Sequence, residues 1–120
     1  MTTVLIIEDE MNIRLFVSAN LDARGYTVLE AETGEQGLQL LRQASPNAVI
    51  LDMLLPDMTG WDVLDEMMKD EKIKDIPVIL MTASISVDES ANYPNLVQRV
   101  TKPASVNVLL DALRSVTQQP

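Results

Sequence analysis

The 120-residue chain contains neither cysteine nor histidine. Without cysteine it can form no disulfide and no zinc–thiolate site. Without histidine it has no histidine general base, no phosphohistidine and no histidine-ligated metal. Aromatic residues make up only 3% of the chain, and no apolar stretch approaches the roughly 20 residues that span a bilayer. Carboxylate, hydroxyl and amine groups therefore carry whatever chemistry the chain performs.

Basic residues are also scarce, with 9 against 18 acidic residues and a formal net charge of −9. A surface this anionic disfavours nucleic acid, where neutralising phosphates supplies most of the affinity, and it disfavours anionic membranes. No basic segment precedes the first acidic residue, Glu8, so the N-terminus is not typical of a signal peptide. We therefore expect a cytoplasmic protein that binds neither nucleic acid directly nor membranes.

The length and the 47% hydrophobic content predict one folded domain over residues 1–120. Short apolar runs alternate with stretches of helical spacing, which predicts an α/β fold with a parallel sheet. Five strands are expected, at 4–7, 26–31, 48–51, 78–81 and 96–101.

The polarity of these runs predicts their order in the sheet. The first, third and fourth runs are wholly apolar, as expected of central parallel strands. The second contains Thr27 and Glu30, and the fifth contains Gln98 and Arg99, so both belong at the edges. The order 2-1-3-4-5 satisfies this and describes a doubly wound, flavodoxin-like sheet with helices on both faces. Its connection reverses between the first and third strands, where ligands bind in such folds.

Several residues mark where helices are expected to begin or end. Gly25 is expected to stop the first helix, and Thr33 with Gln36 forms a plausible capping box for the second. Ser105 is expected to cap the last helix. The segment Ser84 to Asn95 is rich in polar residues, so the fourth helix should be weak or short.

Chemically capable side chains follow the ends of four of the apolar runs. They are Glu8-Asp9, Asp52, Thr82 and Lys102. Because the carboxyl ends of parallel strands lie at one edge of the sheet, three carboxylates, a hydroxyl and an ammonium should converge there.

This set of groups suits a hard cation and a phosphoryl group. Mg²⁺ takes oxygen ligands and commonly uses one or two carboxylates with waters, so Asp9 and Asp52 are the expected direct ligands and Glu8 would act through water. A backbone carbonyl just after Asp52 would complete the set. Asp52 could then act as a nucleophile and form an acyl phosphate, with Lys102 and Thr82 facing the phosphoryl oxygens.

The same residues carry a resemblance to a known family. Glu8-Asp9, Asp52 followed by Pro56 and Gly60, Thr82-Ala83 and Lys102-Pro103 occur in order over nearly the whole chain. This pattern resembles the receiver domain of two-component response regulators, of the single-domain chemotaxis type.

The resemblance implies that Asp52 is the phosphoacceptor, supplied by a phosphohistidine on a separate histidine kinase or phosphotransfer protein. It implies that Glu8, Asp9 and Asp52 hold Mg²⁺ together with the carbonyl of Leu54. Thr82 would move toward the phosphoryl group, Lys102 would pair with it, and the Lys102-Pro103 bond would be cis. A downstream protein would dock on the fourth helix, fifth strand and fifth helix.

Two departures from the family pattern affect the output side. Arg99 occupies the position three residues before the lysine where receivers usually carry tyrosine or phenylalanine. Arg99 is therefore either an exposed edge-strand residue or a partner contact, and Tyr93 lies too far back to replace the aromatic. The segment from Thr82 to Lys102 is also about two residues shorter than the pattern and lacks its usual Ala-Gly pair.

A further departure bears on the lifetime of the phosphoryl group. Leu54 and Ser84 occupy the positions that flank the path of attacking water in the family. The leucine offers no hydrogen bond to that water, which predicts slow self-dephosphorylation.

Three other functions are compatible with parts of the sequence. A pseudo-receiver, which binds partners without phosphorylation, is favoured by Arg99 and opposed by the intact acidic set. A Mg²⁺-dependent aspartyl-phosphate phosphohydrolase usually needs an acid–base carboxylate two residues after the nucleophile, where this chain has Leu54. A flavodoxin-like cofactor role is disfavoured by the few aromatics and the lack of a Ser/Thr-rich phosphate loop.

Overall fold

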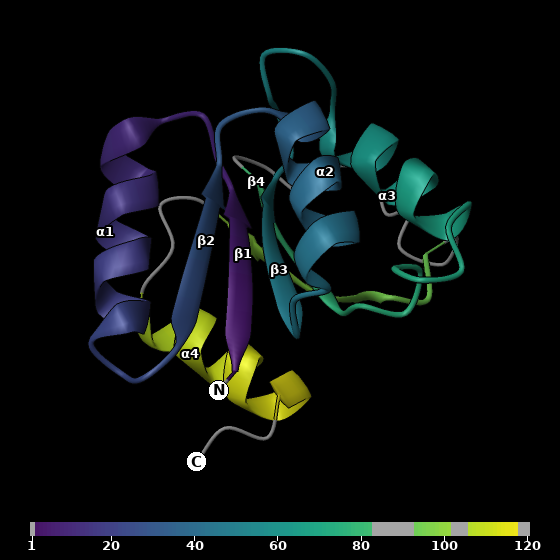
Figure 1. The fold of residues 1–120 in the computed structure, drawn as a ribbon. Helices are drawn as coiled ribbons and strands as arrows, with labels where there is room; N and C mark the ends of the chain where they lie inside the picture. The colour runs from purple at the N-terminus through teal and green to yellow at the C-terminus, as the bar shows by residue number, and fades with distance from the viewer. Residues whose placement is uncertain (1, 83–92, 102–105, 118–120) are drawn as a thin grey trace.

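Five parallel strands form one sheet at the centre of the molecule, in the order β2-β1-β3-β4-β5 (Figure 1). The computed structural model describes residues 2–82, 93–101 and 106–117. The elements in this part of the chain are β1 (Thr3–Ile7), α1 (Met11–Asp22), β2 (Thr27–Ala31), α2 (Gly34–Ala44), β3 (Ala48–Asp52), α3 (Gly60–Met68), β4 (Val78–Thr82), β5 (Leu96–Thr101) and α4 (Val106–Thr117). The strand order agrees with the one expected from the polarity of the runs.

The helices cover the sheet in two layers, with α1 and α4 on one face and α2 and α3 on the other (Figure 1). Alternate residues of the strands feed the two layers, since side chains point to opposite faces of a sheet. On β1, for example, Ile6 packs in the α1–α4 layer and Ile7 in the α2–α3 layer, and both are fully buried. This burial on both sides explains why the central strands are apolar without alternation.

The strand registers keep the carboxyl ends level. Ile7 pairs with Ala31 on one side and with Leu51 on the other. Asp52 pairs with Met81, the residue before the end of β4. The ends of β1, β3 and β4 therefore reach one edge of the sheet, and the order in which successive strands are added reverses between β1 and β3.

Helix boundaries differ in detail from the expectations. Helix α1 ends at Asp22, and Gly25 follows in the turn with a φ of 91°, a conformation that suits glycine. Thr33 caps α2 as predicted, by accepting from the Gln36 N–H, but the Gln36 side chain accepts from the N–H of Glu32. The predicted capping box is therefore only half formed, because Gln36 reaches one residue further back.

Two predictions on helices lie outside the described residues. The expected short fourth helix falls largely on residues 83–92, which the structure does not describe. Ser105 falls in residues 102–105, which are likewise not described. Within the described ranges, no helix is both long enough and apolar enough to cross a membrane.

The loop after β3 is tied to the start of α2 by one carboxylate. Asp57 accepts from the N–H of Gly34 at 2.8 Å and from the N–H of Glu35 at 3.0 Å. These are two of the donors that an isolated helix would leave unsatisfied. The hydrogen bond from Gly34 is the largest of the effects that lower the pKa of Asp57 below 3.8. The chain thus uses the positive end of α2 to anchor the loop beyond Asp52.

Replacing Asp57 with alanine should lower the free energy of unfolding by about 1 kcal/mol near neutral pH, as expected when a helix cap is lost. Because the folded pKa is depressed, this contribution is fully present above pH 3.8 and is lost as pH falls through the lower folded value. Urea unfolding at several pH values measures it. Asp75→Ala, in the loop before β4, is the control, and a difference independent of pH would contradict the carboxylate's role.

Candidate functional site

Three carboxylates meet at the edge where β1 and β3 end. Glu8 and Asp9 directly follow β1, and Asp52 is the last residue of β3. One carboxylate oxygen from each lies within 4.8 Å of the other two. Glu8 is fully buried and Asp52 is 5% exposed, whereas Asp9 is exposed. The structure therefore brings together the three acidic residues that were expected to form the site.

The donor set of this cluster fits a hard divalent cation. All three side chains offer carboxylate oxygens, which are the ligands that Mg²⁺ prefers, and the exposed Asp9 leaves the cluster open to solvent on one side. Mg²⁺ usually retains several waters, so a partly open site suits it. The residues present thus fit the expected cation.

Backbone hydrogen bonds hold the acidic segment after β1. The N–H of Glu8 donates to the carbonyl of Ala31 on β2 at 3.0 Å, which extends the pairing of β1 by one residue. The N–H of Glu10 donates to the Glu8 carboxylate at 3.3 Å. Glu8 is thereby oriented by the chain that leads into α1.

The loop after Asp52 turns tightly back toward the sheet. Met53 donates its N–H to the carbonyl of Met81 at 3.0 Å, and Gly60 donates to the carbonyl of Met53 at 2.6 Å. A Cβ on Gly60 would lie only 3.2 Å from the Asp52 carbonyl oxygen, so the close return of the chain favours glycine there. Leu54 forms an isolated bridge with Thr59 and is 68% exposed. The role of its carbonyl as a metal ligand stays a prediction.

The remaining predicted site residues are placed only through their strands. Thr82 ends β4 and pairs with Thr101, the last residue of β5. Its backbone therefore reaches the same edge, one residue beyond the partner of Asp52. Lys102, which follows Thr101, and Ser84 lie outside the described residues, as do the side chains of Thr82 and Arg99.

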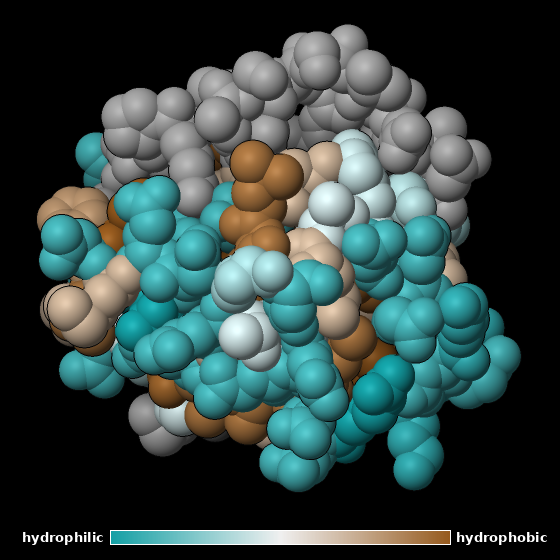
Figure 2. All heavy atoms as spheres, turned by 90° about the horizontal axis from the view of Figure 1, so that it is seen from above, coloured by the Kyte–Doolittle hydropathy of each residue, from teal (hydrophilic) through white to brown (hydrophobic). Residues whose placement is uncertain are grey.

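Viewed from above, toward this edge of the sheet, the described surface is mainly hydrophilic, and some hydrophobic residues show among the polar ones (Figure 2). Two exposed large hydrophobic residues belong to segments that leave the edge. Met11 begins α1 and is 60% exposed, and Leu54 follows β3. Exposed apolar side chains thus lie two residues after Asp9 and two residues after Asp52 along the chain.

Two functional features were not found by sequence reasoning. Arg14 is buried and donates to the backbone carbonyl of Glu8, and Asp57 anchors the loop beyond Asp52. The available signal for Arg14 was its place on the inward stripe of α1, three residues before Val17 and seven before Leu21. An arginine on an apolar stripe indicates a buried acidic or carbonyl partner.

Trp61 and Tyr93 form a further contact beside the loop. Their rings stack with centroids 5.6 Å apart, and the Tyr93 hydroxyl donates to Asp65 at 2.6 Å. Trp61, at the start of α3, thus packs against the residue that leads toward β5.

Fold and site together define a doubly wound α/β domain with an acidic cluster at its switch point. The sequence profile of the response regulator receiver domain matches residues 4–114. The chain therefore belongs to the receiver domain family of two-component response regulators.

Individual relatives agree with this assignment. The chain is 36% identical over 118 residues to the probable transcriptional regulator ycf27 of Guillardia theta, covering 97% of this chain and 45% of the relative. It is 32% identical over 121 residues to the DNA-binding dual master transcriptional regulator RpaA of a Synechocystis strain, covering 99% and 50%. The chain thus spans about half the length of these curated relatives.

Solved structures resemble the chain over its whole length. The chemotaxis protein CheY4 of Vibrio cholerae superposes with a TM-score of 0.89 at 28% identity, covering 97% of this chain and 98% of that one. The described sheet and its covering helices are therefore the receiver fold.

Replacing Asp9 with asparagine should raise the free energy of unfolding by about 1 kcal/mol at low salt without divalent cations. Like charges a few ångströms apart repel by roughly this amount when one of them faces water. Urea unfolding in a chelator checks the gain, and added salt should reduce it. Asp75→Asn is the control, and a loss of stability in Asp9→Asn would contradict the expected repulsion.

Proposed function

We propose that the chain is a phosphorylation-controlled receiver in two-component signal transduction, which accepts a phosphoryl group on Asp52. The convergence of Glu8, Asp9 and Asp52 within 4.8 Å carries this proposal, in a chain that belongs to the receiver family. The donor is a phosphohistidine on a histidine kinase or a phosphotransfer protein. The setting is the cytoplasm, and the domain acts as a switch and not as an enzyme with turnover.

In the transfer step, an Asp52 carboxylate oxygen attacks the phosphorus of the donor. A phosphorus–oxygen bond forms as the phosphorus–nitrogen bond breaks, and the donor imidazole leaves with the bonding electron pair. Glu8, Asp9, Asp52 and the Leu54 carbonyl would hold Mg²⁺, which supplies positive charge opposite the phosphoryl oxygens.

The surroundings of Asp52 keep the acceptor in place for this attack. Asp52 ends a fully buried strand, and the next residue is hydrogen-bonded to both Met81 and Gly60. The acceptor therefore needs little reorganisation when the donor arrives. Lys102 and the Thr82 hydroxyl would contact the phosphoryl oxygens from the adjacent strands, which end at the same edge.

The output of the switch is a protein contact. A downstream protein docks on the expected fourth helix, which falls outside the described residues, together with β5 and α4. The net charge of −9 disfavours direct contact of this domain with nucleic acid or with an anionic membrane. Relatives named as transcriptional regulators are about twice as long as this chain, so DNA binding would belong to their other half.

Arg99 favours a second candidate, the pseudo-receiver, because it stands where receivers usually carry the aromatic residue. The convergence of all three carboxylates weighs against it, since a domain without phosphorylation has no need of them. A phosphohydrolase is opposed by Leu54, whose apolar side chain offers no acid–base group at the expected position. The receiver switch is therefore the function that the site supports best.

Incubating the chain with Mg²⁺ and acetyl phosphate should add the mass of one phosphoryl group. Intact mass spectrometry should show this adduct in the unmodified chain and its loss in Asp52→Asn, because the amide is not nucleophilic. Chelating the divalent cation should also prevent it. A chain that gains no phosphoryl group under these conditions would instead be a pseudo-receiver, and sustained turnover of a phosphomonoester would indicate the enzyme.

The acyl phosphate should hydrolyse slowly, and Leu54→Asn should shorten its lifetime several-fold. An asparagine two residues beyond Asp52 can hydrogen-bond an attacking water, which the exposed leucine cannot do. The decay of the phosphorylated species, followed by intact mass after removal of donor, measures both lifetimes. Leu15→Asn, an exposed leucine on α1, is the matched control. A lifetime of seconds that the Leu54 substitution leaves unchanged would count against this explanation.

A further inference from the structure

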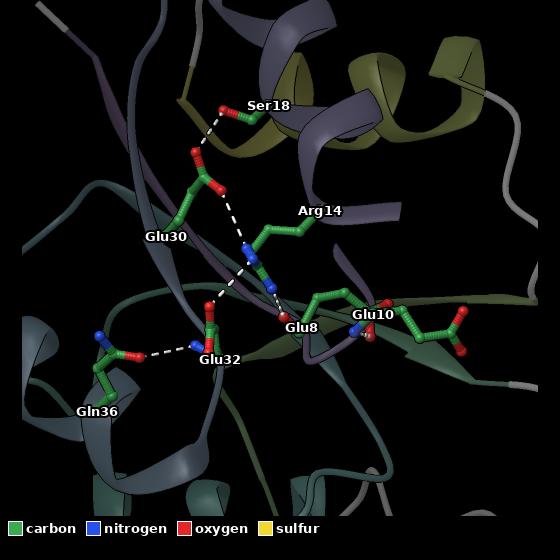
Figure 3. A network of polar contacts seen from close by, with 7 residues as sticks. All are labelled: Glu8, Glu10, Arg14, Ser18, Glu30, Glu32 and Gln36. Atoms are coloured by element: carbon green, nitrogen blue, oxygen red, sulfur yellow. Dashed lines mark hydrogen bonds and ion pairs between the residues drawn. The ribbon is translucent and has the colours of Figure 1, made fainter. Parts of the chain in front are cut away.

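Arg14 lies directly behind the acidic cluster and is held on three sides. Its side chain is only 8% exposed. Nη1 donates to the carbonyl oxygen of Glu8 at 2.9 Å, Nε to Glu30 at 3.1 Å and Nη2 to Glu32 at 3.2 Å (Figure 3). One guanidinium thus joins α1, the end of β1 and the end of β2.

The two carboxylate partners of Arg14 are fixed in turn. The Ser18 hydroxyl donates to the second carboxylate oxygen of Glu30 at 3.1 Å. The Gln36 side chain accepts from the backbone N–H of Glu32 at 2.8 Å, which holds that residue against the start of α2 (Figure 3). The buried guanidinium is therefore bonded to residues that make further hydrogen bonds of their own.

The hydrogen bond from Arg14 to the Glu8 carbonyl affects how the carboxylates of the acidic cluster are positioned. The carbonyl of Glu8 and the N–H of Asp9 belong to one planar peptide group. Anchoring that carbonyl limits the rotation of the peptide and so fixes the direction in which the Asp9 side chain leaves the backbone. The N–H of Glu8, which belongs to the preceding peptide group, donates to the carbonyl of Ala31. The two peptide groups on either side of the Glu8 Cα are thereby each held by a hydrogen bond.

The charge of Arg14 does not serve to neutralise the acidic cluster. Its positive charge faces two carboxylates of its own, so the group of Arg14, Glu30 and Glu32 carries a net charge of −1. Removing the arginine would make the surroundings more negative, and electrostatics alone would then favour a divalent cation more strongly. Loss of positioning would instead weaken cation binding. An electrostatic role and a positioning role of Arg14 therefore predict opposite changes in affinity for the cation when the arginine is removed.

We propose that Arg14 is a positioning residue for the divalent cation site, which it prepares by fixing the peptide between Glu8 and Asp9. The proposal rests on the proposed function insofar as this site takes Mg²⁺. Arginine suits the task because its planar group carries five donors in a rigid fork. A lysine ammonium has the same charge but is a compact point charge, and it cannot reproduce that spread of donors across three segments.

Arg14→Lys and Arg14→Met, made in the full chain, test the assignment. Partners of metal ligands typically change affinity by 10- to 100-fold, so Mg²⁺ should bind about 10-fold more weakly to both variants in isothermal titration at constant ionic strength. In the metal-free proteins, the amide resonance of Asp9 should shift, because its peptide has lost the guanidinium. Arg42→Met is the matched control, since Arg42 lies on α2, which carries neither the acceptor nor a metal ligand, and its Nε pairs with the Asp70 carboxylate.

Three results would overturn the proposal while leaving the receiver function intact. They are unchanged or tighter Mg²⁺ binding in Arg14→Met, restoration of normal affinity by Arg14→Lys, and a lower free energy of unfolding with unaltered affinity. If Arg14→Met does not fold, the charge-preserving Arg14→Lys decides. Absence of Mg²⁺ binding or of Asp52 phosphorylation in the unmodified chain would instead remove the receiver function and this proposal together.

Discussion

Parallel pairing of β1 with β3 is the constraint on which the site depends. The register from Val4↔Ala48 to Ile7↔Leu51 brings the two strands to the edge at the same level. Glu8 and Asp9 directly follow β1 and Asp52 ends β3, so one carboxylate oxygen from each comes within 4.8 Å of the other two. Antiparallel pairing, or a register shifted by a few residues, would separate these groups and leave ordinary surface acids.

Holding like charges together costs free energy, and the structure offsets that cost with rigid neighbours. Glu8 is bonded through its backbone to Ala31 and Arg14, and the loop after Asp52 is bonded to Met81 and Gly60. Asp57 then fastens the same loop to the positive end of α2. The acidic cluster is thus held at the sheet edge by contacts with the residue before α1, with the start of α2 and with the buried guanidinium of Arg14. Such prior ordering is what a binding or transfer site requires.

Side-chain contacts also connect the loop after Asp52 with the entry of β5. The loop that begins at Asp52 leads directly into α3, whose Trp61 stacks on Tyr93 and whose Asp65 accepts from the tyrosine hydroxyl. Tyr93 in turn precedes β5, the strand that carries Arg99 in place of the usual aromatic residue. Side-chain contacts thus run from the helix that follows the acceptor loop to the residue before β5.

Sequence reasoning went furthest where the signal was local or additive. Apolar runs, their relative polarity and the acidic residues that end them determined the α/β class, the strand order and the membership of the carboxylate cluster, because burial of a parallel strand requires apolar side chains on both faces. The sequence could not show that Arg14 would face Glu30, Glu32 and the Glu8 carbonyl, or that Asp57 would reach Gly34 across 23 positions. Those contacts join segments that are distant along the chain, and their geometry exists only once the sheet register and the helix packing have placed the backbone. The chain by itself therefore decided which groups are present at the edge, and the tertiary structure decided how they are held.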